Sequence, residues 1–275
     1  MQIKEFNNRK IADKHAEYIT GEKLRKHVAG KVKRYVGDNL SVFDGAVGSG
    51  QLEQFIYPSY ICGVEIQEKA CEVFKENYPQ SEIHCMSFFN FKSDEKYDCT
   101  IMNYPFSLKF KDLTDEEKKN IQELYPWKKS GVVDDIFILR GLDFTKRFAF
   151  YIGFPGITYR KSESKLREII GSKLAELSII ENGFEDTPIS VIFMVIDKEK
   201  TNSTVYKEIY DCKKDELLYF ELEVDPDYMW NVPRIEPVRE EIDIETLERE
   251  IEYEKQRRRE LEDKLDEFIR VTFKI

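Results

Sequence analysis

The sequence predicts an α/β fold in which a mostly parallel sheet carries helices on both faces. Short apolar runs alternate with amphipathic, helix-like segments between residues 40 and 200, as in chains built from βαβ units. A glycine-rich turn follows directly on the first apolar run, where open α/β sheets bind ligands. We therefore expect one large domain over residues 1–200, a mixed strand and linker extension over 201–239, and a long helix over 240–275.

A helix is expected first, over residues 20–36. Leu24, Val28, Val32 and Tyr35 recur there at intervals of three and four, and Thr20 is a suitable N-cap. Seven strands and four further helices follow from the same kind of pattern. The strands are expected at 41–44, 60–66, 82–86, 97–103, 148–154, 174–180 and 189–197, and the helices at 50–56, 67–77, 132–147 and 161–171.

The composition changes after residue 200. Two mixed strands are expected within 204–223, followed by a proline-rich linker. From Glu240 onward the chain is mostly charged, with apolar residues at heptad spacing and with Glu254 and Arg258 interrupting their centre. A helix of this kind needs a packing partner. Its apolar positions, called the seam below, are Ile244, Leu247, Ile251, Leu261, Leu265 and Phe268.

Charge and composition exclude several classes of protein. The chain has 53 acidic and 43 basic residues, a net charge of −10, so unaided binding to nucleic acid should be weak. No apolar run is long enough to cross a bilayer, and the N-terminus lacks the apolar stretch of a secretory signal. Five cysteines without a CxxC pair and three scattered histidines indicate a cytoplasmic protein with reduced thiols and no metal site.

The first chemical motif is the sequence FDGAVGSG at positions 43–50. Asp44 ends the first expected strand, and glycines at 45, 48 and 50 follow it. Glu65 ends the second expected strand, where a carboxylate can accept both hydroxyls of a ribose. Because the carboxyl ends of parallel strands share one edge of a sheet, we expect a nucleotide-like ligand there.

The second motif is NYPF, which directly follows the expected strand at 97–103. Asn103 offers an amide oxygen, Pro105 constrains the backbone at Tyr104, and Phe106 offers a flat apolar face. An amide oxygen, a fixed carbonyl and an aromatic plate together suit an amino group on a planar ring.

The pair DGAVGSG and NYPF resembles motifs I and IV of the S-adenosylmethionine-dependent N(6)-adenine DNA methyltransferases. The segment TGEKLRKHV before the first strand, and the stretch from 134 to 198, resemble the gamma class and the modification subunit of type I restriction-modification systems. The resemblance covers roughly residues 15–200. It implies a Rossmann-like class I methyltransferase fold, with a mostly parallel seven-stranded sheet and an antiparallel terminal hairpin, followed by the C-terminal helix.

The resemblance also implies roles for individual residues. Asn103, the Tyr104 carbonyl, Pro105 and Phe106 would receive the target adenine, and Thr20 would lie near the carboxylate of S-adenosylmethionine. The rest of the implied cofactor site is Asp44, Gly45, Ala46, Gly48 and Gly50 for the methionine part, Glu65 and Ile66 for the ribose, and Ser87 and Phe88 for the adenine.

Four positions depart from the family pattern. The family usually has proline where this chain has Gly21, Gly45 and Tyr104, and aspartate where it has Ser87. Ser87 is a weaker partner for the cofactor adenine than a carboxylate, so these changes bear on rate and affinity more than on fold.

The resemblance implies a DNA substrate and a partner. In type I systems a separate specificity subunit reads the DNA, and the C-terminal helix is expected to bind such a subunit or a second copy of this chain. Methylation of RNA or of a protein glutamine is an alternative, because similar Asn-Pro-Pro-aromatic turns serve both. A non-catalytic methyltransferase fold that acts as an assembly module is a third.

Overall fold

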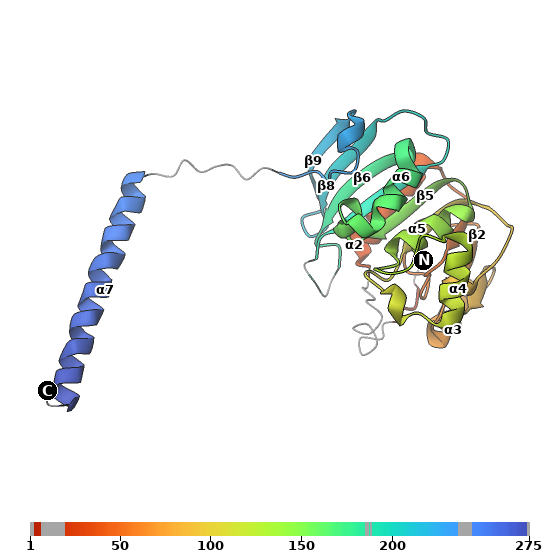
Figure 1. Cartoon of the computed structure of the whole chain (residues 1–275). Helices are drawn as coiled ribbons and strands as arrows, with labels where there is room; N and C mark the ends of the chain where they lie inside the picture. Colours follow the sequence, from red (N-terminus) through yellow and green to blue (C-terminus); the bar gives the residue numbers. More distant parts are fainter. Residues whose placement is uncertain (1–2, 7–19, 185–186, 188, 236–243, 274–275) are drawn as a thin grey trace. The chain divides into compact units, whose positions relative to one another are not determined.

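The computed structural model describes residues 3–6, 20–184, 187, 189–235 and 244–273, without the side chains of 244–247, 250, 263 and 266–273. The chain forms two compact units, Met1–Arg234 and Ile235–Ile275. The first unit is an α/β domain, and the second contains helix α7 (Ile244–Phe273) (Figure 1). The expected junction around residues 236–243 lies outside the described part of the chain.

The α/β unit is built on one sheet with the strand order β3-β2-β1-β4-β5-β7-β6-β8-β9. The strands from β3 to β5 are parallel, and β7 lies antiparallel between β5 and β6. The strands are β1 (Ser41–Asp44), β2 (Tyr60–Glu65), β3 (Glu82–Cys85), β4 (Tyr97–Asn103), β5 (Thr145–Gly153), β6 (Leu174–Glu181), β7 (Val191–Asp197), β8 (Val205–Asp211) and β9 (Glu216–Glu223).

The expectation of seven strands is wrong, because the sheet has nine. β8 pairs parallel with β6, and β9 pairs antiparallel with β8. Five of the eight β6 side chains are buried and the other three are half-buried, so leaving this strand at the edge would expose a row of unpaired backbone groups beside an apolar surface. The two strands after residue 200 cover that edge and extend the domain sheet.

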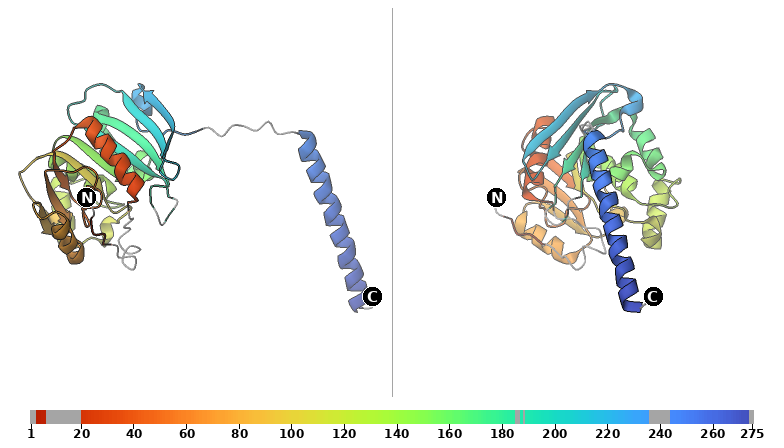
Figure 2. Two further views of the ribbon diagram at one scale, coloured as in Figure 1. Left: turned by 180° about the vertical axis from the view of Figure 1, so that it is seen from behind. Right: turned by 90° about the vertical axis from the view of Figure 1, so that its left-hand side faces the viewer.

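Helices cover both faces of the sheet. α2 (Glu22–Tyr35) lies on one face, and α5 (Asp134–Asp143) and α6 (Ser164–Ile170) lie on the other (Figures 1 and 2). α3 (Glu68–Asn77) connects β2 to β3, and α4 (Asp115–Leu124) lies between β4 and α5 along the chain.

Two local predictions are wrong. Residues 52–56 form consecutive turns instead of the short helix expected at 50–56, and the two backbone bonds there, Gln54 N to Gln51 O and Ile56 N to Glu53 O, each span only three residues. Thr20 does not cap α2 either, since Gly21 occupies the N-cap position and Thr20 pairs with Phe184 as a β-bridge.

A buried ion cluster attaches α2 to the sheet. The ammonium group of Lys31 lies 2.7 Å from a carboxylate oxygen of Glu176 on β6 and 2.7 Å from one of Glu208 on β8. The Tyr35 hydroxyl donates a hydrogen bond of 3.0 Å to Glu176. All three charged side chains are buried. The ion pairs with Lys31 therefore offset the free-energy cost of removing each glutamate from water.

Helix α7 is strongly charged, with ion pairs at i,i+3 and i,i+4 spacing such as Arg258 to Glu262. The described seam residues Ile251, Leu261 and Leu265 are exposed. The side chains of the other seam positions, Ile244, Leu247 and Phe268, lie outside the described residues. No helix in the described part of the chain combines the length and the apolarity that crossing a membrane requires.

Candidate active site

Three polar side chains stand at the carboxyl ends of neighbouring strands. β1 pairs in parallel with β2 on one side and with β4 on the other. Their last residues are Asp44, Glu65 and Asn103, so the topology brings these predicted site residues to one edge of the sheet. Ligands of open α/β sheets bind at this edge.

The glycine-rich turn after β1 is held in place by Glu65. Gly48 and Gly50 have φ values of 56° and 79°, in the left-handed region that glycine adopts without strain. The amide of Gly48 donates to one Glu65 carboxylate oxygen at 3.0 Å, and the amide of Gln67 donates to the other at 2.8 Å. The two amides fix the orientation of the carboxylate, and a carboxylate oxygen has the capacity to accept more than one hydrogen bond.

Gly45 is required by a close approach of two side chains. A Cβ at this position would lie 2.7 Å from the Phe88 ring and 2.8 Å from the methyl group of Met102. Phe88 is buried and stacks on Phe137 at 5.7 Å. The Phe88 ring therefore packs in the core, directly against the glycine-rich turn.

Asp44 has a carboxylate neighbour that the sequence analysis missed. Its own carboxylate is 1% exposed and accepts a 2.7 Å hydrogen bond from the amide of Ala46. The neighbour is Glu53, which is fully buried, and neither of its carboxylate oxygens has a hydrogen-bond donor in the described chain. Burial raises the pKa of Glu53 to about 7, and burial together with the nearby Glu53 raises that of Asp44.

Two acidic groups that have no cationic partner among the described residues favour a shared proton or a positively charged ligand. The sequence signal for Glu53 was weak, because a glutamate in QLEQF is typical of an exposed position.

Asn103 is bonded to Thr20. Its side-chain nitrogen donates to the Thr20 hydroxyl at 2.9 Å, across 83 residues of sequence. Thr20 is itself buried and anchored by its bridge to Phe184. The contact joins two residues that were assigned to different parts of the site, and it fixes the direction of the Asn103 amide.

The residues after Asn103 lie mostly in the core. Tyr104 is 1% exposed and stacks on Phe137 at 5.4 Å, so its backbone carbonyl is the part that can serve a substrate. Phe106 is 4% exposed and packs edge-on against Tyr104 at 5.8 Å, while Pro105 is half-buried. A planar ligand can reach the Phe106 ring only when the groups that cover it move aside.

Ser87 is paired with a carboxylate from another element. Its hydroxyl donates to Glu117 on α4, and Glu117 also completes a capping box with Thr114. Ser87 therefore has a carboxylate neighbour from 30 residues downstream in the sequence. Ile66, by contrast, is 58% exposed.

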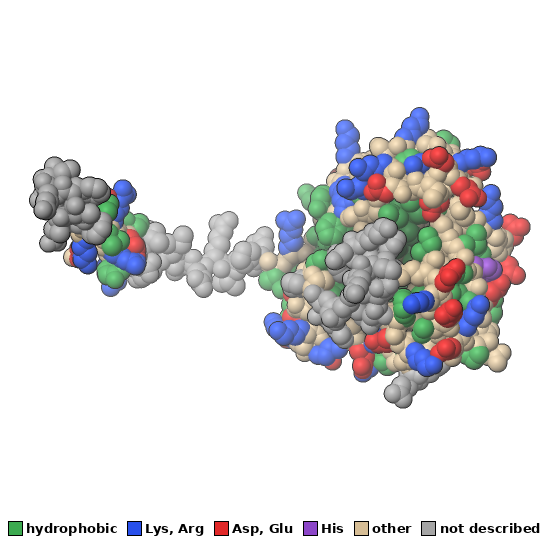
Figure 3. Space-filling model, turned by 90° about the horizontal axis from the view of Figure 1, so that it is seen from below, with side chains coloured by type: hydrophobic (Ala, Val, Ile, Leu, Met, Phe, Trp, Pro, Cys, Tyr) green, Lys and Arg blue, Asp and Glu red, His purple; other side chains and the backbone are tan. Residues whose placement is uncertain are grey.

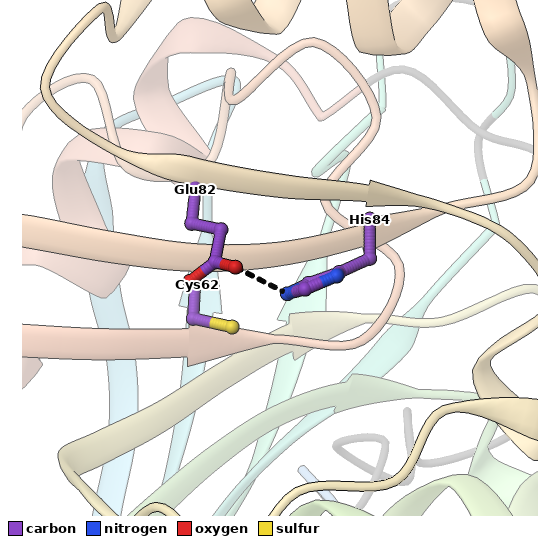
Figure 4. A group of neighbouring side chains, drawn as sticks. All are labelled: Cys62, Glu82 and His84. Carbon is purple, nitrogen blue, oxygen red and sulfur yellow. Dashed lines mark ion pairs between the residues drawn. The ribbon is translucent and has the colours of Figure 1, made fainter.

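A group of possible metal ligands lies elsewhere on the sheet, on β2 and β3. The donor atoms of Cys62, Glu82 and His84 all lie within 4.8 Å of one another (Figure 4). His84 forms an ion pair of 3.1 Å with one oxygen of Glu82, and the Tyr60 hydroxyl donates to the other at 2.8 Å. These contacts already satisfy the glutamate.

Comparison with known proteins gives structural matches alone. No family model and no curated protein sequence matches this chain. The type I restriction-modification methyltransferase subunit from Streptococcus thermophilus is 18% identical, with a TM-score of 0.60 over 70% of this chain and 47% of that one. A protein from Listeria monocytogenes, described as a class I S-adenosylmethionine-dependent methyltransferase, is 13% identical, with a TM-score of 0.59 over 70% of this chain and 65% of that one.

A third match comes from a structure of type I restriction-modification assembly, with 11% identity and a TM-score of 0.60 over 97% of this chain and 68% of that one. The chain spans about half the length of the first of these proteins. At such identities the likeness shows the fold, which is that of class I methyltransferases, as the sequence predicted.

Proposed function

We propose that this chain transfers a methyl group from S-adenosylmethionine to the exocyclic amino group of adenine in DNA. One observation carries the proposal: Asn103, the first residue of the NYPF turn, ends β4 beside the acidic ends of β1 and β2. The class I fold and the restriction-modification proteins among its structural neighbours support it.

In this proposal the first two strand ends hold the cofactor. Asp44 and the turn through Gly45, Ala46, Gly48 and Gly50 would face the methionine part, with Thr20 nearby. Glu65 and Ile66 would hold the ribose, and Ser87, Phe88 and Glu117 would flank the adenine. The paired carboxylates of Asp44 and Glu53 fit a ligand that carries positive charge. When bound, S-adenosylmethionine supplies an electrophilic methyl group on a sulfonium.

The NYPF turn would prepare the target amino group. The lone pair of the adenine amino group is delocalised into its ring, so the nitrogen is a poor nucleophile. The Asn103 side-chain oxygen and the Tyr104 carbonyl would accept its two hydrogens, which favours a tetrahedral nitrogen with the lone pair directed at the methyl group. Phe106 would stack on the base after it leaves the duplex.

The alternative functions differ only in the methyl acceptor, which would be RNA or a protein glutamine instead of DNA. They remain alternatives because similar turns serve all three acceptors. The arrangement of motifs favours DNA, since the segment around Thr20 precedes β1 and the stretch from α5 to β7 follows the gamma-class pattern.

We further propose that a DNA-specificity subunit docks on the seam of α7, with a second copy of this chain as the alternative. The exposed apolar residues Ile251, Leu261 and Leu265 support this proposal. The acidic net charge of −10 supports it too, because the partner would supply the affinity for DNA that the chain lacks.

The test combines cofactor binding with analysis of the product. Calorimetry of the full chain with S-adenosylmethionine is followed by transfer of a labelled methyl group to mixed duplex DNA, RNA or protein, and by digestion of the product. We expect N(6)-methyladenine in DNA. Failure to bind S-adenosylmethionine, or label in RNA or on glutamine, would refute the proposal.

Asn103→Ala isolates the role of the turn. We expect the variant to keep most of its affinity for S-adenosylmethionine, although Thr20 loses its bond to the Asn103 side chain. We expect the transfer rate to fall on the order of a hundredfold, because one preorganised acceptor is missing. Asn231→Ala removes an exposed asparagine and serves as the matched control. Wild-type transfer by Asn103→Ala would mean that the NYPF turn is structural.

A further inference from the structure

A basic cavity lies beside the segment that follows the NYPF turn. It has a volume of about 540 Å³, and four lysines line it, Lys109, Lys111, Lys118 and Lys129, with Ser130 and Gly131 between them. The described residues that line it include no aspartate or glutamate. In a chain with a net charge of −10, four lysines around one cavity form a local concentration of positive charge.

The cavity is built on paired backbone segments. Lys109 and Val132 form an antiparallel bridge, and the amide of Phe110 donates to the Gly131 carbonyl at 2.8 Å. Phe110 is 5% exposed and anchors the pair in the core. Lys118 extends from α4, whose first turn is fixed by the capping box of Thr114. The positions of the lysine backbones are therefore set before any ligand binds.

The charges of this cavity are largely uncompensated. Among the described residues, Lys109, Lys111 and Lys129 form no ion pair, and Lys118 has one weak contact, 3.8 Å, with the exposed Asp115. Elsewhere on the domain the signs are mixed, and on the face in Figure 3 basic and acidic side chains are interspersed. A concentration of one sign attracts a ligand of the opposite sign.

The position along the chain identifies the source of that ligand. Lys109 follows Phe106 by three residues, so their Cα atoms are at most about 11 Å apart. Successive phosphates along one DNA strand advance by about 3.4 Å along the helix axis. A strand that placed a base against Phe106 would bring a neighbouring phosphate within reach of the cavity.

We propose that the lysine cavity binds a backbone phosphate of the DNA strand that carries the target base. This inference rests on the proposed function and adds a second point of contact to it. The lysines supply charge, and the apolar walls of Phe110 and Val132 suit the adjoining sugar. Contacts to phosphate position a strand without reading its sequence. The site therefore complements a partner that chooses the sequence.

The test measures DNA binding without methyl transfer. Fluorescence anisotropy with a labelled duplex is recorded for the full chain as a function of salt concentration. The pocket variant is Lys109→Gln with Lys129→Gln. The control, Lys69→Gln with Lys75→Gln, changes the net charge equally through exposed lysines on α3.

A lost phosphate contact lowers the slope of log K against log salt by about 0.9, which is about eightfold in affinity at 0.1 M salt. We expect the pocket variant to lose roughly eightfold or more, with a slope shallower by about one to two. We expect the control to match the wild type.

The outcomes separate the two proposals. Equal affinity and slope for the pocket variant and the wild type would overturn the cavity assignment and leave the methyltransferase proposal standing. A pocket effect on an RNA of the same sequence, without one on DNA, would overturn the DNA assignment. A wild-type chain that binds no DNA even at low salt would overturn the cavity assignment alone, because the methyltransferase proposal already expects a partner to supply most of the affinity for DNA.

Discussion

Glu53 should make the stability of this domain depend on pH in an unusual direction. The carboxyl group is fully buried beside Asp44, and burial raises its pKa from 4.5 to about 7. Between pH 4.5 and about 7, Glu53 is therefore protonated in the folded chain and ionised in the unfolded chain. The contribution to stability is complete below pH 4.5 and is lost as the pH rises through about 7.

The size of the effect follows from the two pKa values. At 1.36 kcal/mol for each pKa unit, a change from 4.5 to about 7 corresponds to about 3 kcal/mol in the free energy of unfolding. Glu53→Gln keeps the shape of the protonated side chain and removes its titration. We expect the variant to be nearly as stable as the wild type at pH 5, and more stable than the wild type at pH 8 by up to about 3 kcal/mol.

Urea unfolding at pH 5, 6, 7 and 8, followed by tryptophan fluorescence, measures this difference. Glu216→Gln, at an exposed position on β9, controls for the loss of one surface charge. A difference between Glu53→Gln and the wild type that stays constant from pH 5 to pH 8 would show that Glu53 titrates normally. That result would contradict the burial of the Glu53 carboxyl group beside Asp44.

Three further predictions concern the fold. Lys31→Met removes the ammonium group that pairs with two buried glutamates and should cost about 3–5 kcal/mol in urea unfolding, whereas Lys33→Met on the exposed face should cost little. Gly50→Ala should lower the melting temperature more than Gly48→Ala, since both have positive φ but a Cβ at position 50 alone would clash with a tyrosine ring, at 2.3 Å. A chain ending at Arg234 should melt at the same temperature as the α/β domain of the full chain. Light scattering should show that it forms neither the dimer nor the partner complex proposed for the seam of α7.

The strand ends could be predicted because strand pattern and turn chemistry are local. Asp44, Glu65 and Asn103 each end an apolar run, and parallel strands place such ends together whatever the loops do. Helix α4 was missed, because DEEKKNIQEL buries only Glu117 and Ile121 and carries almost no apolar periodicity.

The partners of the site residues could not be predicted. Glu117 reaches Ser87 across 30 residues, and Thr20 reaches Asn103 across 83, so both contacts depend on tertiary packing. The nine-stranded sheet was missed for a related reason. The sequence of β8 is compatible with a small separate hairpin, and only its pairing with β6 makes it part of the main sheet.

The place of β7 in the sheet has a consequence for synthesis of the chain. All seven of its residues are buried, and it fills the slot between β5 and β6, which precede it in sequence. Until Asp197, the last residue of β7, has left the ribosome, β5 and β6 lack the strand that pairs with both of them. Each strand then presents an unpaired backbone edge, flanked by apolar side chains, to other chains during translation. The late strand β7 therefore completes the pairing of β5 and β6 during synthesis, and the β8–β9 hairpin can then pair with the other edge of β6.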